Sequence, residues 1–311
     1  MRRLAFMIVA GALPIGAMAQ LYTENFDVDH TANWTVNKGL NPTGSFADFF
    51  FDYSTYGIGS ANGAGGTTRG LRLEANVTGG IFSGLSVSPN GQSFTGDYVV
   101  TAKAWLNFVG PAPVGGSGST QLGGMGIGTA GTVPQWAGGT QDSVWFATTT
   151  DGNSASDWRA YSSAAPTRYV DGNAVYFAPS TNSSHAYYAG FGGATPPAAQ
   201  TALFASQTGS TIAGSAGFAW RDFVVEVVGG FATWKVDNLP IARVDLSTVT
   251  LGGSNIHFNY MDSNAGITTD PNRLNFMIID NVSVQAVPEP ATIVVLGAAG
   301  AALLRRRRKS A

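Results

Sequence analysis

Apolar and polar residues alternate along most of the chain, which is the period of a β-strand with one buried face. Clusters of Gly, Asn and Asp separate the alternating segments, as tight turns require. One short helix is expected, at residues 198–207 after Pro196-Pro197. The predicted strands are residues 98–108, 143–148, 157–161, 223–228, 231–236, 241–244, 255–260 and 275–284.

Short turns join several of these strands into hairpins, for example Gly229-Gly230 between two alternating segments. Many strands with short connections, and no alternation of strand with helix, predict an all-β fold, an antiparallel β-sandwich with long Gly-rich loops. Residues 20–287 are expected to form this single large domain. Within it, residues 109–139 are rich in Gly and contain Pro111 and Pro113, so we expect a loop-rich insertion there.

The first nineteen residues have the pattern of a secretory signal peptide. A positive start is followed by ten apolar residues, 4–13, and then by Ala17-Met18-Ala19, a small-residue cleavage site before Gln20. Ten apolar residues reach only about 15 Å as a helix, against a hydrocarbon core of about 30 Å. We therefore expect cleavage between Ala19 and Gln20 rather than an uncleaved anchor.

The C-terminal segment, residues 288–311, has three parts. Val287 leads into Pro288-Glu289-Pro290, residues 291–304 are apolar, and a basic block at 305–309 follows. Fourteen apolar residues make a helix of about 21 Å, which spans a membrane with tilt and local thinning. The basic block is expected to keep the end of this short transmembrane helix on the cytoplasmic side.

Pro-Glu-Pro, a short apolar helix and a terminal arginine cluster together resemble the PEP-CTERM sorting signal. In that family an exosortase, a peptidase of the inner membrane, recognises the tail and cleaves near the triplet, and the mature protein passes to the cell surface or extracellular matrix. A plain tail anchor is the alternative, although it does not need Pro-Glu-Pro. The predicted processing residues are Ala19, Gln20, Val287, Pro288, Glu289, Pro290, Arg305, Arg306, Arg307 and Arg308.

The body carries a second, weaker resemblance, to concanavalin A-like jelly rolls. Residues 24–27 with 34–36 resemble the first strand of such domains, and residues 223–236 resemble one of their hairpins. Residues 279–284 are similar to their last strand, which lies beside the first. The resemblance implies architecture and no activity. The whole chain also resembles PEP-CTERM proteins of no assigned activity, which favours a non-catalytic role.

Composition excludes several function classes. The chain has no Cys, which removes disulfides, thiolate metal sites and cysteine nucleophiles. Of its 17 basic and 19 acidic residues, ten and eighteen remain once both terminal segments are set aside, a net charge of −8 for residues 20–287. Nucleic acid is therefore not an expected partner, because phosphate binding needs clustered Lys and Arg.

Catalytic motifs are not apparent in the sequence. The body has three glutamates, Glu24, Glu74 and Glu226, and none is followed two or four residues later by a second carboxylate, as in the E-x-D-x-E array of a glycosidase strand. There is no G-x-S-x-G, and the three histidines lack metal-binding spacing. Residues 126–131 match G-x-G-x-x-G, but Val133-Pro134 follows in place of a helix, so we interpret this segment as a glycine-rich loop.

Two kinds of binding site are compatible with the sequence, one for calcium and one for sugar. Oxygen-rich loops favour calcium, and the better candidate ligands are Asp262, Asn264 and Asp270, although Asp and Asn also serve turns without metal. Sugar rings stack on aromatic side chains near loops. Trp136, Trp158 and Tyr188 are the candidates for such contacts, whereas Trp145 and Trp234 lie mid-strand and are expected in the core.

Together these features predict an exported protein of the cell surface or extracellular matrix, sorted by an exosortase, with a non-catalytic structural or interaction role. A carbohydrate-binding, lectin-like module is the alternative, followed by a polysaccharide hydrolase. The expected partners are the export machinery, signal peptidase, an exosortase-type peptidase and extracellular polysaccharide. No cofactor is expected apart from the calcium ion considered above.

Overall fold

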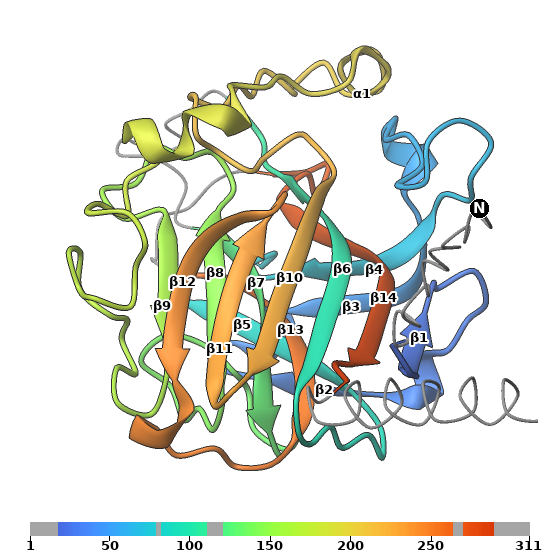
Figure 1. Cartoon of the computed structure of the whole chain (residues 1–311). Helices are drawn as coiled ribbons and strands as arrows, with labels where there is room; N and C mark the ends of the chain where they lie inside the picture. Colours follow the sequence, from blue (N-terminus) through green and yellow to red (C-terminus); the bar gives the residue numbers. More distant parts are fainter. Residues whose placement is uncertain (1–17, 79–81, 111–120, 264–269, 289–311) are drawn as a thin grey trace, which may run out of the picture.

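Two antiparallel β-sheets pack face to face in the computed structural model, which describes residues 18–78, 82–110, 121–263 and 270–288 (Figure 1). The larger sheet has the order β12-β11-β10-β6-β14-β4-β3, with β1 also paired to β14. Its strands are β1 Gln20–Glu24, β3 Phe46–Asp52, β4 Arg69–Glu74, β6 Tyr98–Asn107, β10 Arg221–Val228, β11 Phe231–Val236, β12 Leu239–Asp245 and β14 Phe276–Ala286.

The smaller sheet has the order β2-β5-β13-β7-β8-β9. Every pairing in both sheets is antiparallel, so the predicted all-β antiparallel sandwich is confirmed. The one described α-helix, α1, is short and spans Ala198–Leu203. The strands of the smaller sheet are β2 Trp34–Lys38, β5 Ser83–Pro89, β7 Gln121–Thr129, β8 Val144–Thr149, β9 Trp158–Tyr161 and β13 Asn255–Asp262.

The prediction of a loop-rich insertion over residues 109–139 is wrong for its middle part. Gln121–Thr129 form β7, a fully buried strand between β13 and β8. Glycine is needed there because the neighbouring chains approach closely. A Cβ on Gly124 would lie 1.9 Å from the Phe146 carbonyl oxygen, and one on Gly126 would lie 2.3 Å from the His257 ring. The glycines that suggested a loop therefore permit close packing within a sheet.

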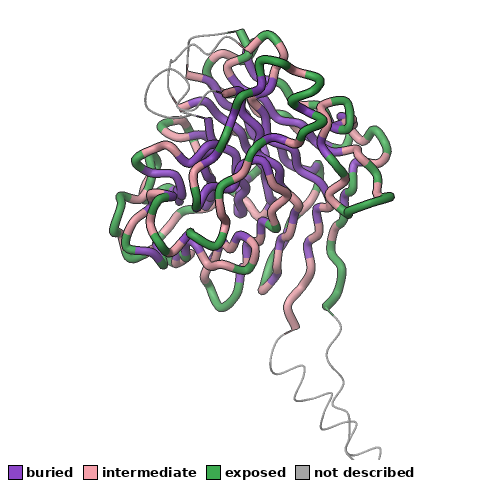
Figure 2. The backbone as a smooth tube through the Cα atoms, turned by 90° about the horizontal axis from the view of Figure 1, so that it is seen from above, coloured by how far each residue is buried: buried purple, intermediate pink, exposed green. Residues whose placement is uncertain are grey.

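Buried residues run through the centre of the molecule along both sheets (Figure 2). The main core lies between the sheets, and a smaller cluster lies on the opposite, outer face of the larger sheet, because neighbouring residues of a strand face opposite sides. In β14, for example, Met277 and Ile279 belong to the main core and Ile278 to the smaller cluster. We call this cluster the covered corner; it consists of Phe51, Tyr53, Ile58, Trp105, Phe108, Phe218, Phe276 and Ile278.

The first and last strands lie side by side, as the resemblance to jelly rolls predicts. Gln20 of β1 pairs with Gln285 of β14. The pairing continues past the strand ends, since the Ala286 amide donates to the Ala19 carbonyl at 2.9 Å. The predicted cleavage site after Ala19 and the start of the predicted sorting segment at Pro288 therefore leave the same edge of the sandwich.

Many of the residues predicted to direct processing lie outside the described residues. Glu289, Pro290, the apolar segment 291–304 and Arg305 to Arg308 lie there, as does most of the predicted signal peptide. Among the helices of the described ranges, none combines the length and apolar character needed to cross a membrane.

Candidate functional site

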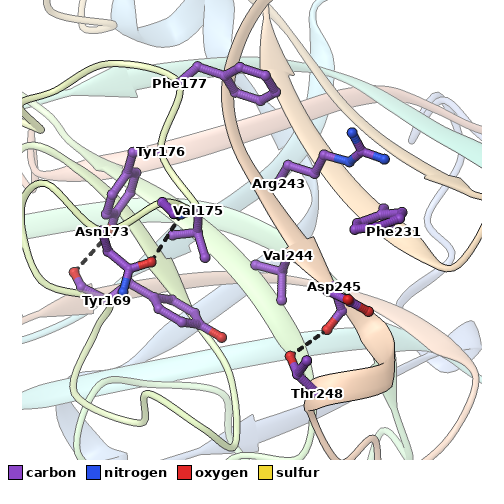
Figure 3. Close-up of a pocket in the computed structure, with 11 residues that line it drawn as sticks. Tyr169, Asn173, Val175, Tyr176, Phe177, Phe231, Arg243, Val244, Asp245 and Thr248 are labelled. Carbon is purple, nitrogen blue, oxygen red and sulfur yellow. Dashed lines mark hydrogen bonds between the residues drawn. The ribbon is translucent and has the colours of Figure 1, made fainter.

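A cavity of about 440 Å³ lies on the surface beside β12 (Figure 3). We call it the β12 pocket. It is formed by the loop 169–177, by Phe231 at the start of β11, and by the second half of β12 with Thr248 just after it. Its lining combines aromatic rings, one arginine and one carboxylate, which is the mixture of groups found in many ligand sites.

The loop 169–177 is fixed to the edge of the larger sheet. The Arg243 amide donates to the Val175 carbonyl at 2.7 Å, and the Phe177 amide donates to the Ile241 carbonyl at 3.1 Å. Tyr176 forms an isolated antiparallel bridge with Ala242 between these two bonds. The outer edge of β12 is thus paired along this stretch, which blunts an otherwise exposed strand edge and positions the loop side chains.

Three aromatic side chains give the pocket its apolar surface. Phe177 is 46% exposed, while Tyr169 and Phe231 are half-buried. Phe231 faces outward because the inward positions of β11 are taken by buried residues such as Trp234. The Arg243 guanidinium carbon lies 3.8 Å from the centroid of the Phe231 ring, a cation–π contact.

The polar rim is built around Asp245. Its carboxylate accepts hydrogen bonds from the Ser247 amide at 2.9 Å and the Ser247 hydroxyl at 2.7 Å. These bonds hold the pKa of Asp245 below its ordinary value, so the group is ionised at neutral pH. Thr248 donates to the Asp245 carbonyl at 2.8 Å (Figure 3). Chemically, the pocket can stack a ring and bond hydroxyl groups.

The aromatic residues predicted to bind sugar lie outside the β12 pocket and are buried. Trp158 and Tyr188 are fully buried and stack on each other with ring centroids 5.2 Å apart. Trp136 is 9% exposed and packs against Phe82. Large rings near loops were covered here by those same loops, so proximity to a loop did not mean access to solvent.

The exposure of the aromatic residues in the β12 pocket was only weakly predictable from the sequence. Phe231 follows the Gly229-Gly230 turn at an outward-facing position of a correctly predicted hairpin, so its exposure follows from strand alternation. Its contact with Arg243 depends on the pairing of β11 with β12, in which Phe231 lies opposite Asp245. The contribution of loop 169–177 could not be read from any local pattern.

Two of the predicted calcium ligands accept hydrogen bonds from protein amides. Asp262 accepts a hydrogen bond from the Asn76 side-chain amide at 2.6 Å. Asp270 accepts two from Asn275, at 2.8 Å from its backbone and 3.0 Å from its side chain. Asn264 lies outside the described residues. Asp262 and Asp270 do line one small polar cavity, of about 30 Å³.

Three carboxylates, those of Glu74, Asp262 and Asp270, and one arginine, Arg273, line that small cavity. Glu74 lines it and contacts Arg72, at 2.8 Å, and Arg273. Burial raises the pKa of Glu74 despite both arginines. Across the described ranges, no group of three or more His, Cys, Asp or Glu side chains could hold a metal ion. The Asp270 Oδ1 atom is buried without a hydrogen-bond partner, whereas its Oδ2 accepts both bonds from Asn275, so the predicted calcium ion stays a prediction.

The other titratable groups considered above have structural partners. Glu24 contacts the His30 ring at 2.8 Å, and Glu226 forms an ion pair with Lys235 at 2.6 Å. His257 is fully buried and contacts the Ser143 hydroxyl at 3.0 Å. Burial lowers the pKa of His257 to about 3, so the ring is neutral.

A comparison with protein families places the PEP-CTERM protein-sorting motif at residues 286–309. The match confirms the sorting segment predicted from Pro288-Glu289-Pro290 and the terminal arginines. It implies export and transit through an exosortase-type sorting route. The motif begins at Ala286, the last residue of β14, so the sorting segment follows the sandwich without a linker. No curated protein matches the chain.

Solved structures match most of this chain at low sequence identity. A Bacillus subtilis protein of unknown function with a galectin-like fold is 10% identical with a TM-score of 0.41, covering 86% of this chain and 96% of that one. The VIP36 exoplasmic/lumenal domain in its Ca²⁺/mannose-bound form is 11% identical with a TM-score of 0.40, covering 83% and 84%.

A third similar structure comes from work on endo-acting O-glycanases of the human gut microbiota. It is 11% identical with a TM-score of 0.46, covering 87% of this chain and all of that one. At these scores and identities the likeness supports no conclusion about binding or activity, and the function must be argued from the site itself.

Proposed function

We propose that this protein acts outside the cell, at the surface or in the extracellular matrix, as a non-catalytic protein whose β12 pocket binds carbohydrate. The observation that carries the proposal is the exposed aromatic surface of Phe177, Tyr169 and Phe231 beside the polar groups of Arg243 and Asp245. Sugar rings present apolar faces that stack on aromatic side chains, and their hydroxyls need donors and acceptors at the rim.

The contacts of the glutamates support a role without catalysis. A retaining glycosidase needs two carboxyl groups about 5 Å apart across a substrate, one of them free to take or give a proton. Glu74 is bound by two arginines, Glu226 by Lys235 and Glu24 by His30. The carboxylate of the β12 pocket, Asp245, is bonded within its own turn. The proposed binding at the β12 pocket does not depend on a calcium ion at Asp262 and Asp270, which lie outside the pocket lining.

Binding isotherms of the processed protein against a panel of neutral and acidic polysaccharides test this function. We expect Phe177→Ala and Phe231→Ala each to weaken binding by about tenfold, the value of one stacking contact of roughly 1–1.5 kcal/mol. The matched control is Phe46→Ala. Phe46 is also exposed, at 39%, and lies under an arginine, Arg273, but it is far from the pocket lining.

Two results would count against the proposal. If no polysaccharide binds, or if Phe46→Ala costs as much affinity as Phe177→Ala, the pocket is not a carbohydrate site. If the same mixtures release reducing sugar, and Glu24→Gln or Glu226→Gln abolishes the release, the protein is a hydrolase. Binding without turnover, lost only in the pocket variants, supports the function as proposed.

The destination is tested by intact-mass analysis of the protein in its host, with and without the sorting peptidase. We expect a secreted species that begins at Gln20 and ends near Pro288. In the strain without the peptidase, the species should retain the tail. Recovery of the secreted protein with residues 291–311 still attached would contradict both the sorting step and the extracellular placement.

A further inference from the structure

We propose that the β12 pocket selects a carboxylated sugar, a uronate residue of an acidic polysaccharide, through the guanidinium of Arg243. The inference rests on the carbohydrate-binding function proposed above and assigns a substrate class to the same site. It depends on Arg243, whose charged neighbour in the pocket is Asp245, and on the other groups that surround it there (Figure 3).

Arg243 differs from most other arginines of the body. Arg69, Arg72, Arg221 and Arg273 each form an ion pair with a carboxylate. Within the described part of the chain, the Arg243 side chain has neither an ion pair nor a hydrogen bond, and it is exposed. An exposed cation in a cavity is a natural site for an anionic ligand group.

The Phe231 ring holds the Arg243 guanidinium in a position from which it can bind a carboxylate. Phe231 lies 3.8 Å from the guanidinium carbon and supports one face of the group. The N–H groups of a guanidinium lie at its edges, so a ring against its face leaves them available. Their fork geometry matches the two oxygens of a carboxylate, and such bonds are about twice as strong as neutral ones.

The rest of the pocket fits a sugar ring that carries such a group. Phe177 and Tyr169 provide aromatic surface beside the arginine. Asp245 is ionised and accepts hydrogen bonds, so it suits hydroxyl groups and repels a second negative charge. Arg243 and Asp245 are alternate residues of β12 that both line the pocket, so a bound ring is favoured with its carboxylate at Arg243 and its hydroxyl groups at Asp245.

The acidic body does not cancel this attraction under physiological salt. Residues 20–287 carry a net charge of −8, which repels a polyanion at long range. At an ionic strength of 0.15 M the Debye length is about 8 Å, so only charges near the pocket act on a bound residue. Lys235, which is on the neighbouring strand β11, is neutralised by Glu226, and Arg243 is the cation that lines the cavity.

The test compares two forms of one polymer. Affinities of the processed protein for polygalacturonate and for its methyl ester, which keeps the sugar ring and removes the charge, are measured at 0.15 M salt, with alginate as a second uronate. We expect the wild-type protein to prefer the acidic polymer by about tenfold or more. Arg243→Gln should abolish the preference, and Arg243→Lys should restore part of it because it keeps the charge but not the fork.

Arg69→Gln is the matched control, since Arg69 also lies over a phenylalanine ring, that of Phe50, but outside the pocket. If Arg69→Gln weakens uronate binding as much as Arg243→Gln, the effect is diffuse charge and the inference is overturned. Equal affinity for both polymer forms, or binding of neutral polysaccharides alone, also overturns it and leaves carbohydrate binding intact. Preference for dextran sulfate over both uronates would reject the carboxylate class. Failure to bind any polysaccharide overturns the function and the inference together.

Discussion

Two arginines on the outer face of the larger sheet lie over aromatic rings, yet their surroundings differ completely. Arg72 of β4 belongs to the covered corner region, is 6% exposed, and contacts the rings of Phe51, Tyr56 and Phe276 at 4.6 to 4.8 Å. Arg243 of β12 is exposed and contacts one ring, that of Phe231. The two strands lie near opposite edges of the same sheet.

The difference shows how a covering layer decides what a charged residue does. Other segments of the chain cover Arg72. The Gln200 side chain of α1, for example, bonds the carbonyl of Tyr56, whose ring packs on the arginine. A cation enclosed in this way needs an acid from the protein, and Glu74 supplies it at 2.8 Å. Arg243 is exposed and makes no ion pair among the described residues, so its guanidinium can pair with a ligand.

The largest effect expected from this comparison is on stability. We expect Arg72→Met to lower the free energy of unfolding by about 3–5 kcal/mol, because it leaves Glu74 buried with Arg273 alone. Arg243→Met should change it by less than about 1 kcal/mol, the value of an exposed cation–π contact. Urea denaturation of the two variants measures the difference.

A double-mutant cycle sharpens this prediction. Adding Glu74→Gln to Arg72→Met removes the buried carboxylate that has lost one of its two arginines, so the double variant should be more stable than the sum of the two single changes predicts. Equal losses for Arg72→Met and Arg243→Met would show that the covering layer makes no difference. An additive cycle would show that the ion pair is not what stabilises the corner.

The sequence alone could not separate the two arginines. Arg72 lies between Leu71 and Leu73, and Arg243 lies between Ala242 and Val244, so both have the pattern of an outward-facing residue on a half-buried strand. The strands themselves were predictable for this reason. What covers the outer face depends on distant loops, whose docking leaves no periodic signal along the chain.

The other errors have related physical causes. Trp158 and Tyr188 were expected to reach solvent because they lie next to loops, but both belong to the main core, through contacts between segments that are distant in the chain. β7 was expected to be loop because its glycines favour turns, whereas close packing against β8 and β13 requires them. The sorting segment was predictable because its three parts are contiguous in the chain and need no tertiary context.

A smaller effect, on the pH dependence of stability, also separates the two regions. In the covered corner, Asp280 accepts hydrogen bonds from the Tyr53 hydroxyl at 3.0 Å and from the Asn281 amide at 2.7 Å. Burial nevertheless raises the pKa of Asp280 to about 6. In the β12 pocket, hydrogen bonds from Ser247 lower the pKa of Asp245. The two carboxylates therefore act on stability in opposite directions.

The signs follow from proton linkage. Between pH 4 and 6 the unfolded chain has lost the Asp280 proton while the folded protein keeps it, so the free energy of unfolding falls as pH rises. Asp245 contributes stability above its unfolded pKa and loses that contribution as pH falls through its lowered folded value. We expect the stability of Asp280→Asn relative to wild type to increase by roughly 2 kcal/mol from pH 4 to pH 7.

Denaturation curves of wild type, Asp280→Asn and Asp245→Asn at these two pH values provide the measurement. Asparagine at 280 still accepts the Tyr53 hydroxyl but loses its bond with the Asn281 amide, a cost that is the same at both pH values. The pH-dependent part of the difference therefore isolates the titration of Asp280. Asp245→Asn should shift relative stability in the opposite direction, downward as pH rises. If the two variants move together with pH, burial in the covered corner is not what distinguishes these carboxylates.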